Sequence, residues 1–160
     1  MSWNKSIVDP QTLVVGCLLN ANHDNLSNII QIYGYSHSHG CFVKLSTLSN
    51  GDRIQSIRQL DWCPKSFNNT HYIAGYLTDE TKNNKNDPKL NYNSISIWEL
   101  NISYNDNLDN ITITNDSLVN LKNFLKNELI SRIMWNRTGK EVIVLAENEK
   151  KYIFKAKEEC

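Results

Sequence analysis

The segment Ile57-Arg58-Gln59-Leu60-Asp61-Trp62-Cys63-Pro64 decides the fold class, because its pattern returns twice in the chain. A related segment, Ile130-Ser131-Arg132-Ile133-Met134-Trp135-Asn136, lies further on, and Ser2-Trp3-Asn4 repeats the end of the pattern near the first residue. Repeated segments of this kind indicate an architecture built from similar units. Each of the three Trp residues therefore marks the same point in one unit.

Each Trp segment is followed by an apolar segment and then by an alternating segment that ends in an aromatic residue. These segments are Thr12–Leu19, Ile29–Tyr33 and then Cys41–Leu45 in the first unit, His71–Leu77 and Ser94–Leu100 in the second, and Glu141–Ala146 and Lys151–Lys155 in the third. Alternation with many β-branched and aromatic residues predicts strands and not helices. Short strands in repeating groups of three or four are typical of β-propeller blades. We therefore predict an all-β fold, a partial WD-repeat β-propeller of about three blades.

The three units are longer than usual, because Trp3, Trp62 and Trp135 are 59 and 73 residues apart and the repeat is about 40 to 45 residues. Two Asn-rich stretches, 79–93 and 103–127, hold the excess, and their composition predicts surface loops. We divide the chain into blade one (1–50), blade two (51–120, with the insertion 79–93) and an incomplete last blade (121–160).

The stretch 111–125 allows two interpretations. Ile111-Thr112-Ile113-Thr114 fits the outer strand of blade two, with linker after it, and this is the interpretation we favour. Leu118, Leu121, Phe124 and Leu125 are at helical spacing after a possible Asp116-Ser117 cap, so a short helix is the open alternative.

Composition narrows the possible partners. Lys+Arg and Asp+Glu both total 17, so there is no excess of positive charge to neutralise phosphates, and we expect no direct binding to nucleic acid. No apolar run approaches the roughly 18 residues of a spanning helix, which predicts no membrane insertion. The four cysteines include no Cys-x-x-Cys pair, as expected of reduced intracellular thiols.

No motif indicates chemistry at a site. His37, His39 and Cys41 are three possible metal ligands where a structural zinc site needs four, and they fall where a hairpin is expected. His71 and Asp61, with Ser66 nearby in sequence, lack the context of a catalytic triad. There is no glycine-rich nucleotide-binding motif. We therefore predict no enzyme activity, no catalytic residue, no cofactor and no metal.

Trp residues could form a ligand-stacking surface, but their equivalent positions in the repeat favour packing between blades. The predicted blade-packing residues are Trp3, Trp62, Trp98 and Trp135.

The Trp segments also carry a family resemblance. Ser2-Trp3-Asn4 with the later Ile-Gln-Ile-Tyr strand, the segment Ile57–Phe67, and above all Arg132–Gly139 resemble the last three blades of the SEH-type nucleoporin family, close kin of the COPII coat propeller. The resemblance implies an open six-bladed propeller, of which this chain supplies blades four to six. It also implies a helical scaffold nucleoporin that donates a further blade, the other Y-complex subunits as partners, and in many lineages a nutrient-sensing complex at the vacuolar or lysosomal membrane.

The chain departs from the family pattern near its last strand. Glu147-Asn148-Glu149-Lys150 replaces a Gly-Asp-Asp-Gly turn, Phe154 replaces a Trp, and the outer strand of the final blade is missing. We expect the open edge to bind a partner by strand addition. The candidate partner-binding residues are Tyr152, Ile153 and Phe154, and ordinary blade core is the alternative role for them.

The sequence therefore predicts a scaffold subunit of the nuclear pore coat, located at the nuclear envelope. A COPII vesicle-coat propeller subunit and a generic WD-repeat adaptor are the two alternatives. Because a propeller fold alone does not fix function, this prediction depends on the family resemblance.

Overall fold

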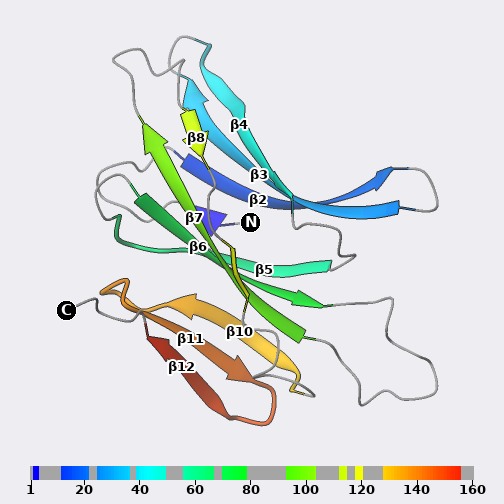
Figure 1. Cartoon of the computed structure of the whole chain (residues 1–160), viewed down its shortest axis with the longest axis vertical. Coiled ribbons are helices and arrows are strands. Elements are labelled where there is room, and N and C mark those ends of the chain that lie inside the picture. Colours follow the sequence, from blue (N-terminus) through cyan, green and yellow to red (C-terminus); the bar gives the residue numbers. More distant parts are fainter. Residues whose placement is uncertain are drawn as a thin grey trace.

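The structure is a computed structural model of the 160-residue chain. It describes residues 2–3, 12–21, 25–36, 39–49, 56–66, 70–78, 93–103, 112–114, 118–120 and 128–155, and it describes side chains within 30–35, 39–47, 57–66, 70–78, 94–101 and 128–155. All regular elements in these ranges are β-strands, and none is a helix. The strands form three antiparallel sheets that follow one another in chain order (Figure 1). The predicted all-β class is confirmed.

The first sheet has the order β1-β2-β3-β4. Its strands are β1 (Ser2–Trp3), β2 (Thr12–Ala21), β3 (Asn25–Ser36) and β4 (Cys41–Ser49). A turn with Gly40 at a φ of 64° joins β3 to β4, in the predicted hairpin position. Neighbouring strands are thus consecutive in the chain, which is the simplest antiparallel topology.

The second sheet has the order β5-β6-β7-β8, with a further strand, β9, also paired to β7. Its strands are β5 (Ser56–Trp62), β6 (Thr70–Thr78), β7 (Asn93–Ser103), β8 (Thr112–Thr114) and β9 (Leu118–Asn120). β8 pairs with Asn101–Ser103 and β9 pairs with Ser96–Trp98, so the two cover one edge of β7 in turn.

The outer strand predicted for 111–114 is confirmed at Thr112–Thr114. At Leu118–Asn120 both the helix alternative and the linker that we favour there are wrong, because these residues form β9. Pairing with β7 explains the difference, because the backbone groups of Leu118–Asn120 form hydrogen bonds with a neighbouring strand. In a helix, the same groups would bond within their own segment. Leu121, Phe124 and Leu125 lie outside the described residues.

The third sheet has the order β10-β11-β12, formed by β10 (Ile130–Trp135), β11 (Glu141–Ala146) and β12 (Lys151–Lys155). The turn between β10 and β11 closes with the Gly139 N–H donating to the Asn136 carbonyl at 3.1 Å. Gly139 has a φ of 70°, the left-handed region that favours glycine. The Asn136 side-chain oxygen also accepts the Lys140 and Glu141 N–H groups, which fixes the turn.

The three sheets share a row of paired residues across their first three strands, which we call a rung. In each, a Trp on the first strand pairs with an apolar residue on the second, which pairs with an aromatic residue on the third. The three rungs are Trp3–Leu13–Tyr33, Trp62–Ile73–Trp98 and Trp135–Val142–Phe154. The second and third sheets also share a register shift four residues before the Trp, between Ile57 and Gln59 and between Ile130 and Arg132. The similarity of the Trp segments is therefore a similarity of structure.

Two core clusters join the three sheets. The first lies between the first and second sheets and contains Ile30, Ile32, Leu60, Trp62, Ile73, Leu77, Trp98 and Leu100. The second lies between the second and third sheets and contains Ala74, Tyr76, Ile95, Ile130, Ile133, Val142, Val144 and Ala146. Successive side chains of a strand point to opposite faces, so β6 contributes Ile73 and Leu77 to one cluster and Ala74 and Tyr76 to the other. The second sheet is thus covered on both faces.

Candidate partner-binding edge of the third sheet

β12 is the last described strand, and among the described residues it pairs with β11 alone. The Ala146 N–H donates to the Lys150 carbonyl at 2.9 Å, so residues 146 and 150 form a hydrogen-bonded pair. Bonded and non-bonded pairs alternate along an antiparallel ladder. The backbone N–H and C=O groups of Lys151, Ile153 and Lys155 consequently face away from β11. They form an edge on which a further strand could pair.

The three predicted partner-binding residues divide between the two faces of β12. Tyr152 and Phe154 are half-buried and pack against the second core cluster. Ile153 lies on the opposite face and is 47% exposed. Phe154 and Tyr152 thus occupy core positions, and of the three side chains Ile153 is the one that a partner can reach.

The turn from Ala146 to Lys150 holds β12 in register with β11. The Glu149 N–H donates to the Ala146 carbonyl at 3.1 Å, and Glu149 has a φ of 67°. This is a three-residue hairpin loop with its last residue in the left-handed region, where glycine is the usual occupant. The stretch Glu147-Asn148-Glu149-Lys150 therefore forms a tight turn without a glycine.

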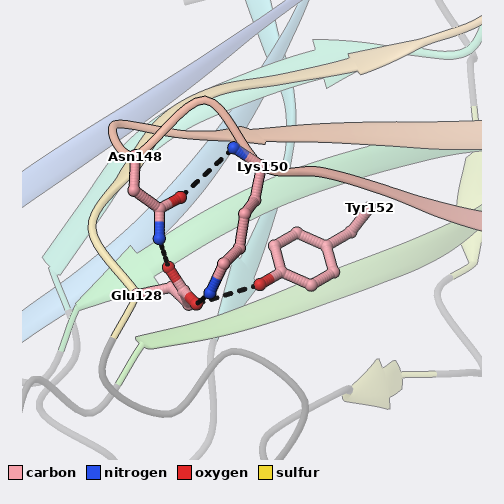
Figure 2. Close-up of polar contacts among 4 residues, drawn as sticks. All are labelled: Glu128, Asn148, Lys150 and Tyr152. Atoms are coloured by element: carbon pink, nitrogen blue, oxygen red, sulfur yellow. Dashed lines mark hydrogen bonds and ion pairs between the residues drawn. The ribbon is translucent and has the colours of Figure 1, made fainter.

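A polar cluster centred on Glu128 links this turn to the two residues before β10. Figure 2 shows Asn148, Lys150 and Tyr152 converging on the Glu128 carboxylate. Its Oε1 accepts from Lys150 Nζ at 2.8 Å and from the Tyr152 hydroxyl at 3.0 Å, and its Oε2 accepts from Asn148 Nδ2 at 2.7 Å. The Glu147 N–H donates to the Leu129 carbonyl at 2.8 Å, which adds a backbone link. The cluster therefore stabilises the position of the first residues of β12.

The charges in the cluster stabilise one another. The hydrogen bond from Lys150, followed by that from Tyr152, lowers the pKa of the Glu128 carboxyl, and the bond to Glu128 raises the pKa of the Lys150 ammonium. Desolvation and the bond to Glu128 raise the pKa of the Tyr152 hydroxyl. Each shift favours the protonation state that keeps the cluster assembled near neutral pH.

The third sheet is attached to the second through two side chains of β5. Gln59 Oε1 accepts the Ile133 N–H at 2.9 Å, and Asp61 Oδ2 accepts the Trp135 N–H at 2.7 Å. These are donors on the edge of β10 that faces away from β11, where they would otherwise lack a strand partner. Gln59 and Asp61 alternate along β5 with the buried Leu60 and Trp62. One set of β5 side chains therefore contacts the third sheet, and the other packs between the first and second sheets.

The predicted blade-packing residues are placed as follows. Trp62 and Trp98 are buried between the first and second sheets. Trp135 is half-buried and packs against the second core cluster, and its ring centroid lies 6.4 Å from that of Tyr72 on the second sheet. Trp3 lies in β1, but its side chain is outside the described residues.

The residues considered for chemistry at a site are placed as follows. His71 is buried with its ring 5.9 Å from Trp62, and Asp61 accepts a backbone N–H at the sheet junction. His39 and Cys41 are exposed, and His37 is outside the described residues. Within the described ranges, no group of three or more His, Cys, Asp or Glu side chains is arranged to hold a metal ion.

Comparison with known proteins identifies no family: no protein-family model and no curated protein matches the chain. In the part of the chain that the structure describes, no helix is long and apolar enough to cross a membrane. The sequence did not predict that Gln59 and Asp61 accept hydrogen bonds from the backbone of β10, or that a polar cluster forms around Glu128. The polar residues at alternate positions of β5, between apolar ones, are the signal that could have indicated the first two.

Proposed function

We propose that this chain forms three consecutive blades of a WD-repeat β-propeller, and that the propeller is a scaffold subunit of the nuclear pore coat. The observation that carries the propeller is the shared Trp–apolar–aromatic rung of the three sheets, Trp62–Ile73–Trp98 and its two equivalents. Propeller blades are repeated antiparallel sheets arranged side by side about one axis.

The placement of the first strands supports the same arrangement. β5 contacts β1 and β2 of the first sheet and β10 of the third. In a propeller, the first strand of every blade lies nearest the axis, so the first strands of adjacent blades are neighbours. The hydrogen bonds from β10 to Gln59 and Asp61 are contacts of this type.

The nuclear pore assignment is carried by the resemblance of Ile57–Phe67 and Arg132–Gly139 to the SEH-type nucleoporin family. In this proposal, a helical scaffold nucleoporin adds a strand of its donated blade to the β12 edge, and the assembly joins the other Y-complex subunits at the nuclear envelope. A second pool in a nutrient-sensing complex at the vacuolar or lysosomal membrane belongs to the same proposal. Strand addition needs little from side chains, because backbone bonds supply affinity.

The experiment is affinity purification of the tagged, full-length endogenous protein, with mass spectrometry of the proteins that co-purify. Recovery of Y-complex nucleoporins is the expected result. Recovery of vesicle-coat subunits or ligase subunits without nucleoporins contradicts the pore assignment.

Two variants test strand addition at β12. Ile153→Pro removes an N–H that faces away from β11, so it leaves the β11–β12 ladder intact and blocks pairing with a further strand. Ile153→Ala keeps that N–H and removes most of the side chain, and it is the matched control. Loss of the helical nucleoporin with the proline variant and retention with the alanine variant is expected. Equal binding by both variants means that the partner does not add a strand here.

A further inference from the structure

The turn between β10 and β11 touches the segment that follows β5. An ideal Cβ on Gly139 would lie 2.9 Å from Sγ of Cys63 and 3.1 Å from Cβ of Lys65. The Cys63 thiol also donates to the Gly139 carbonyl at a sulfur–oxygen distance of 3.7 Å. The second and third sheets are therefore in contact at this end of their first strands, as well as through Gln59 and Asp61.

Three cationic residues gather at this contact. Lys65 comes from the second sheet, Arg137 and Lys140 come from the turn, and all three are exposed. Lys65 and Arg137 form no ion pair with a residue that the structure describes. The carboxylate of Glu141, the next residue after the turn, pairs with Lys155 on the neighbouring strand at 3.5 Å. Two positive charges of the contact therefore have no anionic partner within the described ranges, and charges of like sign repel one another.

Thr138 lies in the middle of this group. It follows Arg137 in the chain and precedes Gly139, the residue that the stem of Lys65 contacts. The residue is exposed, and its hydroxyl donates to Oδ1 of Asn136 at 2.9 Å. Exposed turns are the parts of a fold that other proteins reach most readily. The hydroxyl of Thr138 is thus accessible to a modifying enzyme.

The turn does not depend on the proton of this hydroxyl. Oδ1 of Asn136 also accepts the N–H groups of Lys140 and Glu141, at 3.2 and 3.3 Å. The Gly139 N–H donates to the Asn136 carbonyl at 3.1 Å, and Gly139 has the positive φ of the turn. A substituent on Oγ1 of Thr138 therefore leaves the backbone bonds of the turn in place.

We propose that Thr138 is a phosphorylation site and that its phosphate is held by Lys65 and Lys140. A kinase transfers the γ-phosphoryl group of a nucleoside triphosphate to Oγ1 of Thr138. The Oγ1–H bond breaks and an Oγ1–P bond forms, the nucleoside diphosphate leaves, and the proton goes to the base of the kinase. The phosphate brings a charge of about −1.5 to −2 and acceptor oxygens to the three cations. Its charge-assisted hydrogen bonds then join the turn of the third sheet to the segment after β5.

The first experiment is mass spectrometry of the tagged full-length protein, isolated from its own cells with phosphatase inhibitors and digested with chymotrypsin. Cleavage after Trp135 and Leu145 releases residues 136–145, in which Thr138 is the only residue with a hydroxyl group. The expected peptide carries one phosphoryl group, and Thr138→Val, which keeps the shape of the side chain, abolishes it. Recovery of this peptide in the unmodified form alone overturns the proposal and leaves the scaffold function unaffected.

Thermal unfolding tests the contact with Lys65. The phosphorylated full-length protein is expected to melt roughly 2 °C or more above the same protein treated with a phosphatase, because the new bonds connect two sheets. Phosphatase treatment of Thr138→Val should have no such effect. Lys65→Gln should reduce the difference, whereas Lys44→Gln, an equal change at an exposed position of β4, should not. No difference in the wild type, or one that Lys65→Gln leaves unchanged, contradicts the role assigned to the phosphate.

Discussion

Replacement of Gly75 by alanine is expected to destabilise the protein by about 1–2 kcal/mol. An ideal Cβ at position 75 would lie 2.5 Å from Cζ3 and 2.7 Å from Cη2 of Trp98, and 3.0 Å from Cδ2 of Leu60. Trp98 is 1% exposed and packed in the cluster between two sheets, so its ring has little room to move. Overpacking of this kind costs about 1–3 kcal/mol. The opposing effect, a less flexible unfolded chain, stabilises by about 0.4–1 kcal/mol.

The third sheet indicates which second change relieves the clash. By register, Val144 is equivalent to Gly75 and Phe154 is equivalent to Trp98, so a larger residue on β11 accompanies a smaller ring on β12. Trp98→Phe removes the distal ring atoms that an alanine at 75 would meet. Alone, it is expected to cost about 1–2 kcal/mol through the space it leaves. In combination, the two changes should cost about 1–2 kcal/mol less than the sum of their separate effects.

Urea unfolding of the wild type, both single variants and the double variant, followed by circular dichroism, measures these free energies. The 160-residue chain is used throughout, and similar slopes in all four proteins confirm that the comparison is of stability alone. If Gly75→Ala is as stable as the wild type, or if the two changes add without coupling, the packing of Trp98 across β6 is not as described.

Three further changes test other parts of the fold. Gly139→Ala adds a Cβ at a φ of 70°, only 2.9 Å from Sγ of the buried Cys63, so it should cost about 2–3 kcal/mol in thermal unfolding. Gly40→Ala, at a φ of 64° with no atom within 4 Å, should cost about 1 kcal/mol. Equal costs would refute the close contact at Gly139. Asp61→Ala leaves the Trp135 N–H without its acceptor and should cost about 1–3 kcal/mol in urea unfolding, while Asp61→Asn keeps an acceptor oxygen and should cost less; the reverse order would contradict the junction. Folding lowers the pKa of the Glu128 carboxyl below its ordinary 4.5, so its contribution to stability is present above that pH and is lost as the pH falls through the folded pKa. The melting temperatures of wild type and Glu128→Gln should therefore differ at about pH 7, and the difference should shrink as the pH falls below 4.5. A difference that stays constant would show that the carboxylate is not responsible.

The positions of the main strands could be predicted because local pattern determines them. The apolar run after each Trp and the alternation in Ser94–Leu100 are repeated closely enough to locate β2, β6, β7 and their equivalents. The ends of strands were harder to predict. For example, β3 extends from Asn25 to Ser36, beyond the apolar segment Ile29–Tyr33. Polar residues at the ends of a long hairpin pair through their backbones, which hydrophobic periodicity does not register.

The remaining features depend on pairing between distant residues. β9 could not be predicted, because Leu118–Asn120 becomes a strand by pairing with Ser96–Trp98 and its own sequence is also compatible with a helix. Which of Tyr152, Ile153 and Phe154 is exposed at the candidate edge also depends on packing against the second sheet. The alternation of β12 separates them, since the first and last contact the core and only the middle side chain is exposed. The Glu128 cluster joins residues 20 to 24 positions apart through side-chain geometry that no spacing rule specifies.

The most direct test of the central proposal, a scaffold subunit of the nuclear pore coat, is the location of the full-length protein in its own cells. The protein should be tagged at its chromosomal locus and imaged together with a marker of the pore and a marker of vesicle-budding sites. The account predicts a punctate rim around the nucleus that coincides with the pore marker. A signal at vesicle-budding sites, or one spread through the cell without enrichment at the nuclear rim, would contradict it.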